Sequence, residues 1–150
     1  MLIPKKNERR HFIACETVLN EMLPFLPRDS SYRAIEPGLH LHPEKLKGVL
    51  QAAIDEITTE ADYIILGYGL CSMAVVGLQS TKSTLVVPRA DDCIALLLGS
   101  QENYKKQLEK ERGTYFLSKG WIEAGINIVE EFKQTEERHG KEFADSVKEM

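Results

Sequence analysis

The sequence lacks any excess of positive charge and any long apolar run. Its 150 residues carry a formal net charge of −4, with acidic and basic residues interspersed. Such a surface offers no basic face for a phosphate backbone and no polybasic anchor for a membrane. No window reaches the roughly 20 apolar residues of a transmembrane helix, and no secretory apolar segment follows the basic leader before residue 11. We therefore expect a cytoplasmic protein that binds neither nucleic acid nor membrane.

Cysteine is also scarce. The chain has three cysteines, Cys15, Cys71 and Cys93, an odd number separated by long gaps. This spacing excludes the disulfide framework of small secreted domains, and it lacks the compact C-x-x-C motif of many metal sites. In a reducing compartment the three side chains stay thiols.

What the chain does contain is an alternation of short apolar runs and helical patterns. Runs of this length that are stopped by Gly or Pro are typical of strands buried on both faces of a parallel sheet. The expected strands are residues 12–14, 32–39, 63–66, 85–87 and 114–117. We therefore predict a single α/β domain over residues 1–150, with a mostly parallel sheet of about five strands flanked by helices in Rossmann-like layers. The pattern gives no strand order.

The clearest helix covers residues 43–57, where Pro43 stands at the first helical position. Its expected buried face repeats every three or four residues and consists of Leu46, Val49, Leu50, Ala53, Ile54 and Ile57. We also expect a helix over 18–23, a helix from Asp92 that is interrupted at Gly99, and a final helix that buries Ile122, Ile126, Val129 and Phe132. Residues 73–78 either begin a short helix or cover the core.

Each cysteine follows one of the expected strands. If the strands run parallel, Cys15, Cys71 and Cys93 share the carboxyl end of the sheet, where ligands of α/β proteins bind. Three thiolates suit zinc or an iron–sulfur cluster, and His40 or His42 after the second strand offers a fourth ligand. The alternative is that the cysteines are small buried hydrophobes, since Cys is among the most buried residue types. The sequence favours neither interpretation.

Other residues at the same strand ends are candidates for ligand binding. The segment Gly67-Tyr68-Gly69 lacks the third glycine of a dinucleotide fingerprint and the Lys-Ser/Thr pair of a P-loop. Its glycines instead predict that the backbone passes close to a ligand or another loop. Arg89 and Asp91 could orient an anionic small molecule. The alternative is a solvated turn in which Asp92 caps a helix and Arg89 pairs with a neighbouring aspartate.

These segments resemble an uncharacterised family, the domain of unknown function numbered sixteen thirty-eight (DUF1638). The resemblance rests on IACET at 13–17, GYGLC at 67–71, PRADDC at 88–93, LLGS at 97–100 and GTYFLSKGW at 113–121. The family occurs in methanogenic archaea and anaerobic bacteria, near genes of corrinoid methyltransferases. The resemblance implies a further strand and helix after Met150, so we expect the chain to be truncated at its C-terminus.

The resemblance implies a role in one-carbon, corrinoid-linked methyl metabolism, without an established reaction. Our first hypothesis is a metal-thiolate protein that acts on a small molecule, with Cys15, Cys71 and Cys93 as metal ligands. The second is a non-catalytic ligand-binding or accessory protein for a partner methyltransferase. The third is a truncated domain whose cysteines are structural. The D-x-H-x-x-G pattern is absent, which disfavours direct ligation of cobalamin by a histidine.

Overall fold

The computed structural model describes residues 8–71, 73–125 and 127–148, and side chains 143, 144, 147 and 148 are not described. The chain divides into two compact units, Met1–Phe116 and Leu117–Met150. The first unit carries the sheet and the second is helical. The single domain expected over residues 1–150 stays a prediction.

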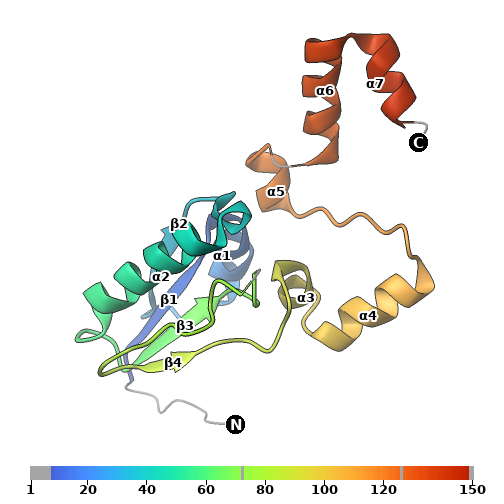
Figure 1. Ribbon diagram of the computed structural model, residues 1–150. Coiled ribbons are helices and arrows are strands. Elements are labelled where there is room, and N and C mark those ends of the chain that lie inside the picture. The colour runs from blue at the N-terminus through green and yellow to red at the C-terminus, as the bar shows by residue number, and fades with distance from the viewer. Residues whose placement is uncertain (1–7, 72, 126, 149–150) are drawn as a thin grey trace. The chain divides into compact units, whose positions relative to one another are not determined.

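The first unit is built on a parallel sheet of four strands, β1 (Arg10–Cys15), β2 (Ser31–Ile35), β3 (Tyr63–Gly67) and β4 (Thr84–Val86). The strand order is β2-β1-β3-β4, and every neighbouring pair is parallel (Figure 1). The predicted α/β fold with a parallel sheet is therefore confirmed.

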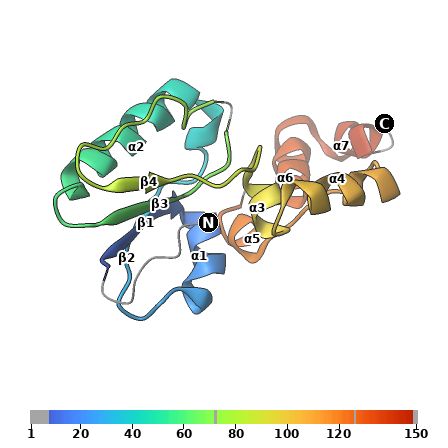
Figure 2. The ribbon, with the colours of Figure 1, turned by 90° about the horizontal axis from the view of Figure 1, so that it is seen from below.

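Helices α1 (Glu16–Met22) and α2 (Pro43–Ile57) cover opposite faces of this sheet (Figure 2). The chain leaves β1 through α1 to reach β2, and then returns through α2 to β3 on the other side of β1. Because crossovers between parallel strands are right-handed, reversing the direction along the sheet moves the helix to the other face. The reversal creates a topological switch point between β1 and β3, the place where ligands bind in open α/β sheets.

The main core lies between the sheet and α2. Helix side chains Leu46, Leu50 and Ile54 are completely buried there, as are Ile13 of β1 and Ile64 of β3. Side chains alternate along a strand, so Ala14 of β1 points to the other face, toward α1. There a Cβ on Gly67 would stand only 2.5 Å from the Cβ of Ala14. Burial on both faces explains the continuous apolar runs of β1 and β3, and the predicted core face of α2 is confirmed.

Two short 3₁₀ helices and two further α-helices complete the first unit. The 3₁₀ helices η1 (Leu23–Phe25) and η2 (Leu39–Leu41) follow α1 and precede α2. Helix α3 (Cys93–Leu97) is capped by Asp92, whose Oδ1 accepts a hydrogen bond of 2.9 Å from the Ala95 backbone. Gly99 then has a φ of +83°, and Ser100 caps α4 (Gln101–Lys110). The expected cap and interruption are both confirmed.

The fifth strand expected at residues 114–117 is wrong. Within the described chain these residues form no strand, and about half of the Tyr115 and Leu117 side chains is exposed. Phe116 instead packs its ring edge against Tyr104 of α4, with ring centroids 5.5 Å apart. Residues of this kind favour a strand without specifying one, because a strand forms only where the edge of another strand accepts its hydrogen bonds, and residues 114–117 pair with none of β1 to β4.

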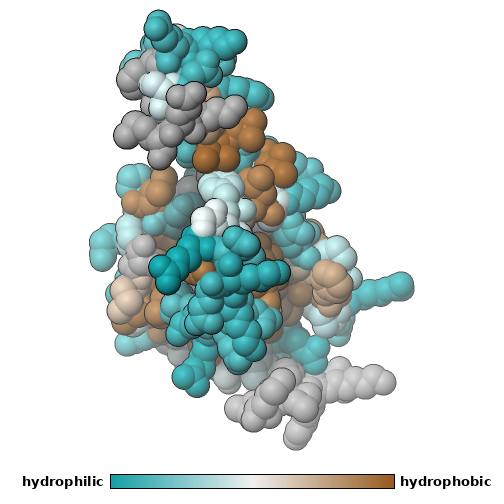
Figure 3. All heavy atoms as spheres, turned by 90° about the vertical axis from the view of Figure 1, so that its right-hand side faces the viewer, coloured by the Kyte–Doolittle hydropathy of each residue, from teal (hydrophilic) through white to brown (hydrophobic). Residues whose placement is uncertain are grey.

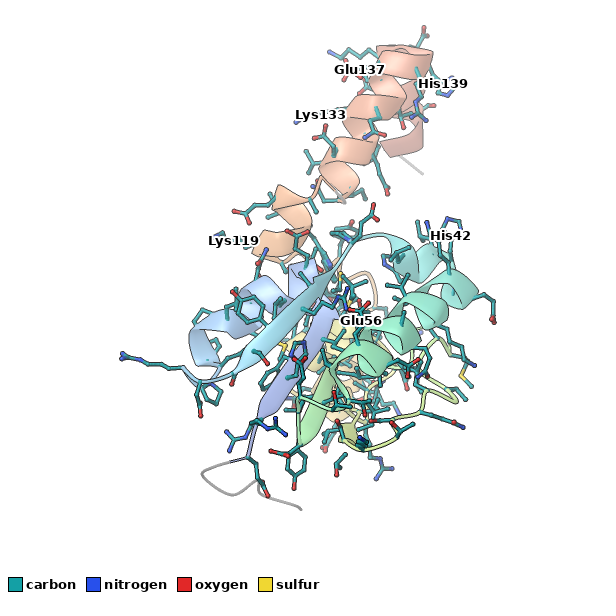
Figure 4. All side chains as sticks on the ribbon, turned by 90° about the vertical axis from the view of Figure 1, so that its left-hand side faces the viewer. His42, Glu56, Lys119, Lys133, Glu137 and His139 are labelled. Atoms are coloured by element: carbon teal, nitrogen blue, oxygen red, sulfur yellow. The ribbon has the colours of Figure 1, made fainter. Side chains whose placement is uncertain are left out.

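The second strand, expected over residues 32–39 with Tyr32, Ala34 and Leu39 inward, is too long, and of these three only Leu39 is buried. β2 ends at Ile35, and the chain then turns at Gly38, which has a φ of +86°. Tyr32 and Ala34 are exposed, whereas Ile35 is buried. β2 lies at the edge of the sheet, where alternation is a weaker guide to the buried face. An ion pair between Arg33 and Glu56 connects β2 to α2 (Figure 4).

The connection from β3 to β4 covers the core without regular structure in its described residues. Residues 73–77 are turns in which Ala74 and Val75 are buried in the main core. Gln51 of α2 then holds the connection, because its side-chain amide exchanges hydrogen bonds of 3.0 and 2.9 Å with the backbone of Gln79. Of the two alternatives for residues 73–78, coverage of the core is the one observed.

The second unit contains α5 (Lys119–Glu123), α6 (Ile128–His139) and α7 (Lys141–Lys148). The single final helix that we expected is therefore interrupted, with Gly125 at a φ of +68° and Asn127 as the cap of α6. Ile122 and Val129 were expected to be inside but are 56% and 55% exposed. Phe132 is partly buried, and Ile126 lies outside the described residues.

Apolar side chains are exposed in both units, and Figure 3 shows such patches in brown among hydrophilic residues. Among the described residues, no helix has the length and apolar character that crossing a membrane requires.

Candidate functional site

The three cysteines follow different strands of the sheet. Cys15 is the last residue of β1, Cys71 follows β3, and Cys93 is the first residue of α3 after β4. Because the strands are parallel, their carboxyl ends lie at one end of the sheet. β1 and β3 are also the two strands of the topological switch point. Cys15 and Cys71 therefore follow the two strands of the switch point.

The loops that carry Cys71 and Cys93 are held together by their backbones. The Leu70 N–H donates to the Ala90 carbonyl at 2.9 Å, and the Cys71 N–H donates to the Asp91 carbonyl at 3.1 Å. Gly69 makes this approach feasible, since a Cβ there would stand 2.6 Å from the Asp92 backbone nitrogen. The glycine that the sequence marked for a close backbone approach thus lies against another loop.

Tyr68 lies among the three thiols. Its side chain is only 4% exposed, and its pKa is raised, first by burial and then by the neighbouring Cys15, Cys71 and Cys93. A group feels such charges only when they lie close by in the protein interior. All three cysteines therefore lie near Tyr68, and we call Cys15, Cys71 and Cys93 the thiol cluster.

Burial keeps Cys71 and Cys93 in their protonated form. The pKa of Cys93 is raised to about 12 by burial first, and then by Cys71, Asp92 and Cys15. Burial also raises the pKa of Cys71, with further contributions from Asp92 and Cys15 that a backbone hydrogen bond from Gly69 partly offsets. Since the thiolate is the reactive form, Cys71 and Cys93 are weak nucleophiles at neutral pH.

Two further features distinguish individual cysteines. Cys71 has a φ of +44°, a left-handed conformation that is strained for any residue with a Cβ. Strain of this kind is common at functional sites, where surrounding structure holds it in place. The sulfur of Cys15 lies 3.2 Å from the hydroxyl oxygen of the buried Thr17, at a distance suited to a hydrogen bond.

The fit of a metal ion to these residues is poor in the arrangement observed. Among the residues that the structure describes, no group of three His, Cys, Asp or Glu side chains is placed to hold a metal ion. His40 lies in η2 and His42 directly before α2 (Figure 4), and both side chains are exposed. The three thiols are thus neighbours without forming a ready ligand set.

Arg89 and Asp91 lie beside the cluster-bearing loops and are both exposed. Within the described chain, Arg89 forms none of the ion pairs, so the expected alternative of a pair with Asp91 or Asp92 is not observed. Asp91 contributes its backbone: its carbonyl accepts from Cys71, and its N–H donates to the Gln101 side chain at 3.0 Å.

Sequence reasoning missed the effect of Asp92 on the thiols and the burial of the Tyr68 side chain. Asp92 was expected in the charged turn with Arg89 and Asp91 or as a helix cap, and its carboxylate also contributes, after burial, to raising the pKa of Cys71 and Cys93. Tyr68 was expected as a ligand-binding residue of the segment 67–69, and its side chain is buried near the thiols. A large aromatic residue between two glycines at the end of a buried strand was the available signal for Tyr68.

These observations define an α/β protein with a buried tyrosine and three thiols at the carboxyl end of a parallel sheet. The comparison with protein families is specific: the family described as "Protein of unknown function (DUF1638)" matches residues 34–150. The chain belongs to this family, as the resemblance implied. The matched range includes Cys71 and Cys93 and begins after Cys15. Neither the curated proteins nor the solved structures gave a significant match.

Proposed function

We propose that this chain binds and acts on a small molecule at the thiol cluster, in one-carbon, corrinoid-linked methyl metabolism. The observation that carries the proposal is the position of Cys15, Cys71 and Cys93 near Tyr68 at the carboxyl end of the sheet. A purely structural role does not require three partly buried thiols at the end of the sheet where ligands bind. The strained backbone of Cys71 at the same place supports a functional role further.

The chemistry available at neutral pH follows from the protonation states. Tyr68 keeps its proton because its pKa is raised, so its hydroxyl can donate a hydrogen bond to a ligand. Arg89 is an exposed cation on the loop after β4 and would hold an anionic group of the ligand through its planar fork. The neutral thiols of Cys71 and Cys93 would contact the less polar part of the ligand.

Zinc or an iron–sulfur cluster bound by Cys15, Cys71 and Cys93 remains a proposal with a specific difficulty. Three thiolates are suitable ligands for either, and zinc would supply Lewis-acid chemistry. The described residues, however, include no group of three placed to hold a metal ion. Because burial raises the pKa of Cys71 and Cys93, binding of either group would require these two thiols to lose their protons.

A second candidate is an accessory protein for a partner methyltransferase. Three apolar side chains in the loop after β3 favour it, because Leu70, Met73 and Val76 are 41%, 60% and 44% exposed beside Cys71. Exposed apolar groups that lie close together are a feature of protein interaction sites. This candidate shares the location of the thiol cluster but predicts that a protein, not a small molecule, covers it.

The test begins with protein purified without oxygen. Zinc and iron are measured per chain in the wild type and in Cys15→Ser, Cys71→Ser and Cys93→Ser. The absorption spectrum of hydroxocobalamin and the thermal shift with inorganic phosphate then serve as ligand probes. A spectral or thermal response lost in the cysteine variants or in Arg89→Lys supports the small-molecule site. A wild type that holds no metal and responds to neither probe, while binding a corrinoid methyltransferase, would favour the accessory role.

A further inference from the structure

Cys71 and Cys93 lie on two loops that are fixed against each other. The carbonyl of Asp91, two residues before Cys93, accepts a hydrogen bond of 3.1 Å from the Cys71 backbone. Gly69 also lies directly against the second loop. A Cβ on Gly69 would stand only 2.6 to 2.8 Å from the Asp92 nitrogen, the Ala90 carbonyl oxygen and the Asp92 Cα. The two cysteines are therefore held near each other by backbone that has little freedom to separate.

The backbone distinguishes Cys15 from this pair. Cys71 and Cys93 lie on the two loops that these backbone contacts join, whereas Cys15 is the last residue of β1. Cys15 has a separate contact, because its sulfur lies 3.2 Å from the Thr17 hydroxyl. All three cysteines are free and partly exposed, so that a small reagent can reach them.

We propose that Cys71 and Cys93 form a reversible disulfide by exchange with a low-molecular-weight disulfide, while Cys15 remains a thiol. The proposal rests on the thiol cluster of the proposed function and requires neither the metal nor the small-molecule ligand. The bond would tie the loop after β3 to the first residue of α3 and would remove two of the three thiols from the site. Oxidation would thereby switch the site off.

The exchange is balanced in two steps. The Cys71 thiolate attacks one sulfur of the disulfide RSSR, which breaks the S–S bond and releases one RS⁻, protonated to RSH. The Cys93 thiolate then attacks the Cys71 sulfur of this mixed disulfide and releases the second RSH. Two protein thiols are oxidised to a disulfide, and one RSSR is reduced to two RSH. No other oxidant is needed.

The thiol environments set the order and speed of these steps. Burial raises the pKa of Cys93 to about 12, with further contributions from Cys71, Asp92 and Cys15, so Cys71 is the first nucleophile of the pair. Once Cys71 is in the mixed disulfide it carries no charge, and the second step becomes easier for Cys93. Because burial raises the pKa of both thiols, the reaction is slow at neutral pH and accelerates as the pH rises.

The positions of the basic residues make the test direct. Cleavage after Lys and Arg places each cysteine in its own peptide, with Cys15 in 11–28, Cys71 in 48–82 and Cys93 in 90–105. Reduced wild-type protein is incubated with oxidised glutathione at mildly alkaline pH, blocked with iodoacetamide, digested without reduction and analysed by mass spectrometry. The same experiment is performed on Cys15→Ser, Cys71→Ser and Cys93→Ser.

The proposal predicts one cross-link, between peptides 48–82 and 90–105, with Cys15 recovered as the alkylated thiol. Cys15→Ser should form the same cross-link, whereas Cys71→Ser and Cys93→Ser should carry glutathione adducts only. A cross-link that includes peptide 11–28, a link between two chains, or adducts without any cross-link in the wild type would overturn it. Metal content and probe binding of the reduced protein are measured separately, so failure here is distinguishable from failure of the proposed function.

Discussion

Gly69 and Asp92 lie in direct backbone contact, although they follow different strands. A Cβ on Gly69 would stand 2.6 Å from the backbone nitrogen of Asp92 and 2.8 Å from its Cα. Backbone atoms that are also fixed by neighbouring hydrogen bonds cannot shift easily to make room. This contact sets the spacing of the loops that carry Cys71 and Cys93.

Replacing Gly69 by Ala should therefore destabilise the protein by at least about 1–3 kcal/mol, the range of overpacked sites. Gly48 provides the matched control, because it lies in α2 and a Cβ there would meet nothing within 4 Å. Gly48→Ala should stabilise the protein by about 0.5–1 kcal/mol, since Ala is the better helix former. Urea denaturation measures both. Equal effects of the two substitutions would contradict the close contact.

The left-handed backbone of Cys71 leads to a second comparison. Its φ of +44° suits glycine, and the conformation costs other residues about 1–2 kcal/mol. Glycine also adds freedom to the unfolded chain, worth about 0.4–1 kcal/mol. We expect Cys71→Gly to be more stable than Cys71→Ala by up to about 1 kcal/mol in denaturant unfolding. If the Ala variant were the more stable of the two, Cys71 would not carry backbone strain.

The core face of α2 predicts the largest loss from a single side chain. Leu50 is completely buried against the sheet, so Leu50→Ala should cost about 2–5 kcal/mol through lost burial and a remaining cavity. Lys45 is exposed on the same helix, and Lys45→Ala should change the free energy of unfolding by less than about 0.5 kcal/mol. An unchanged denaturation midpoint in Leu50→Ala would show that this face is not the core.

Asp92 has two roles that substitution can separate. An asparagine in its place would keep the cap of α3 but remove the negative charge, which raises the pKa of both Cys71 and Cys93. Asp92→Asn should therefore preserve stability and lower both thiol pKa values, so that alkylation by iodoacetamide speeds up at a fixed pH. Asp92→Ala should also lower these pKa values and lose about 0.5–2 kcal/mol of stability. Unchanged alkylation rates in Asp92→Asn would show that the charge of Asp92 does not act on Cys71 and Cys93.

The features that could be predicted are those that local pattern encodes. Leu46, Leu50 and Ile54 repeat with the helical period, so the buried face of α2 follows from the sequence. Cys15 and Cys71 follow apolar runs, and parallel strands place such residues at one end of a sheet. The run at 114–117 shows the limit, because its residues favour a strand but do not determine whether a neighbouring strand is free to pair with it.

The site's finer geometry depends on packing between distant segments. The approach of Gly69 to Asp92 and the backbone conformation of Cys71 arise from contacts between loops that lie far apart in the sequence. The same holds for the distances among the three sulfurs, which decide whether they can share a metal ion. Residue types at strand ends could therefore indicate the thiol cluster, but not its spacing or the burial of Tyr68 among the thiols.

The electrostatic coupling of Cys15, Cys71 and Cys93 into one cluster underlies both proposals. It is tested most directly by the pH dependence of alkylation of Cys93, followed peptide by peptide with iodoacetamide in wild type, Cys71→Ser and Cys15→Ser. Circular dichroism at each pH verifies that the protein stays folded.

Because Cys71 contributes more than Cys15 to raising the pKa of Cys93, the alkylation rate of Cys93 should increase most in Cys71→Ser and less in Cys15→Ser. Wild-type Cys93 should still be gaining reactivity above about pH 9, the range in which an ordinary thiol has already ionised. A rate that levels off near that pH and is the same in all three proteins would show that the thiols are isolated, and the cluster would not exist.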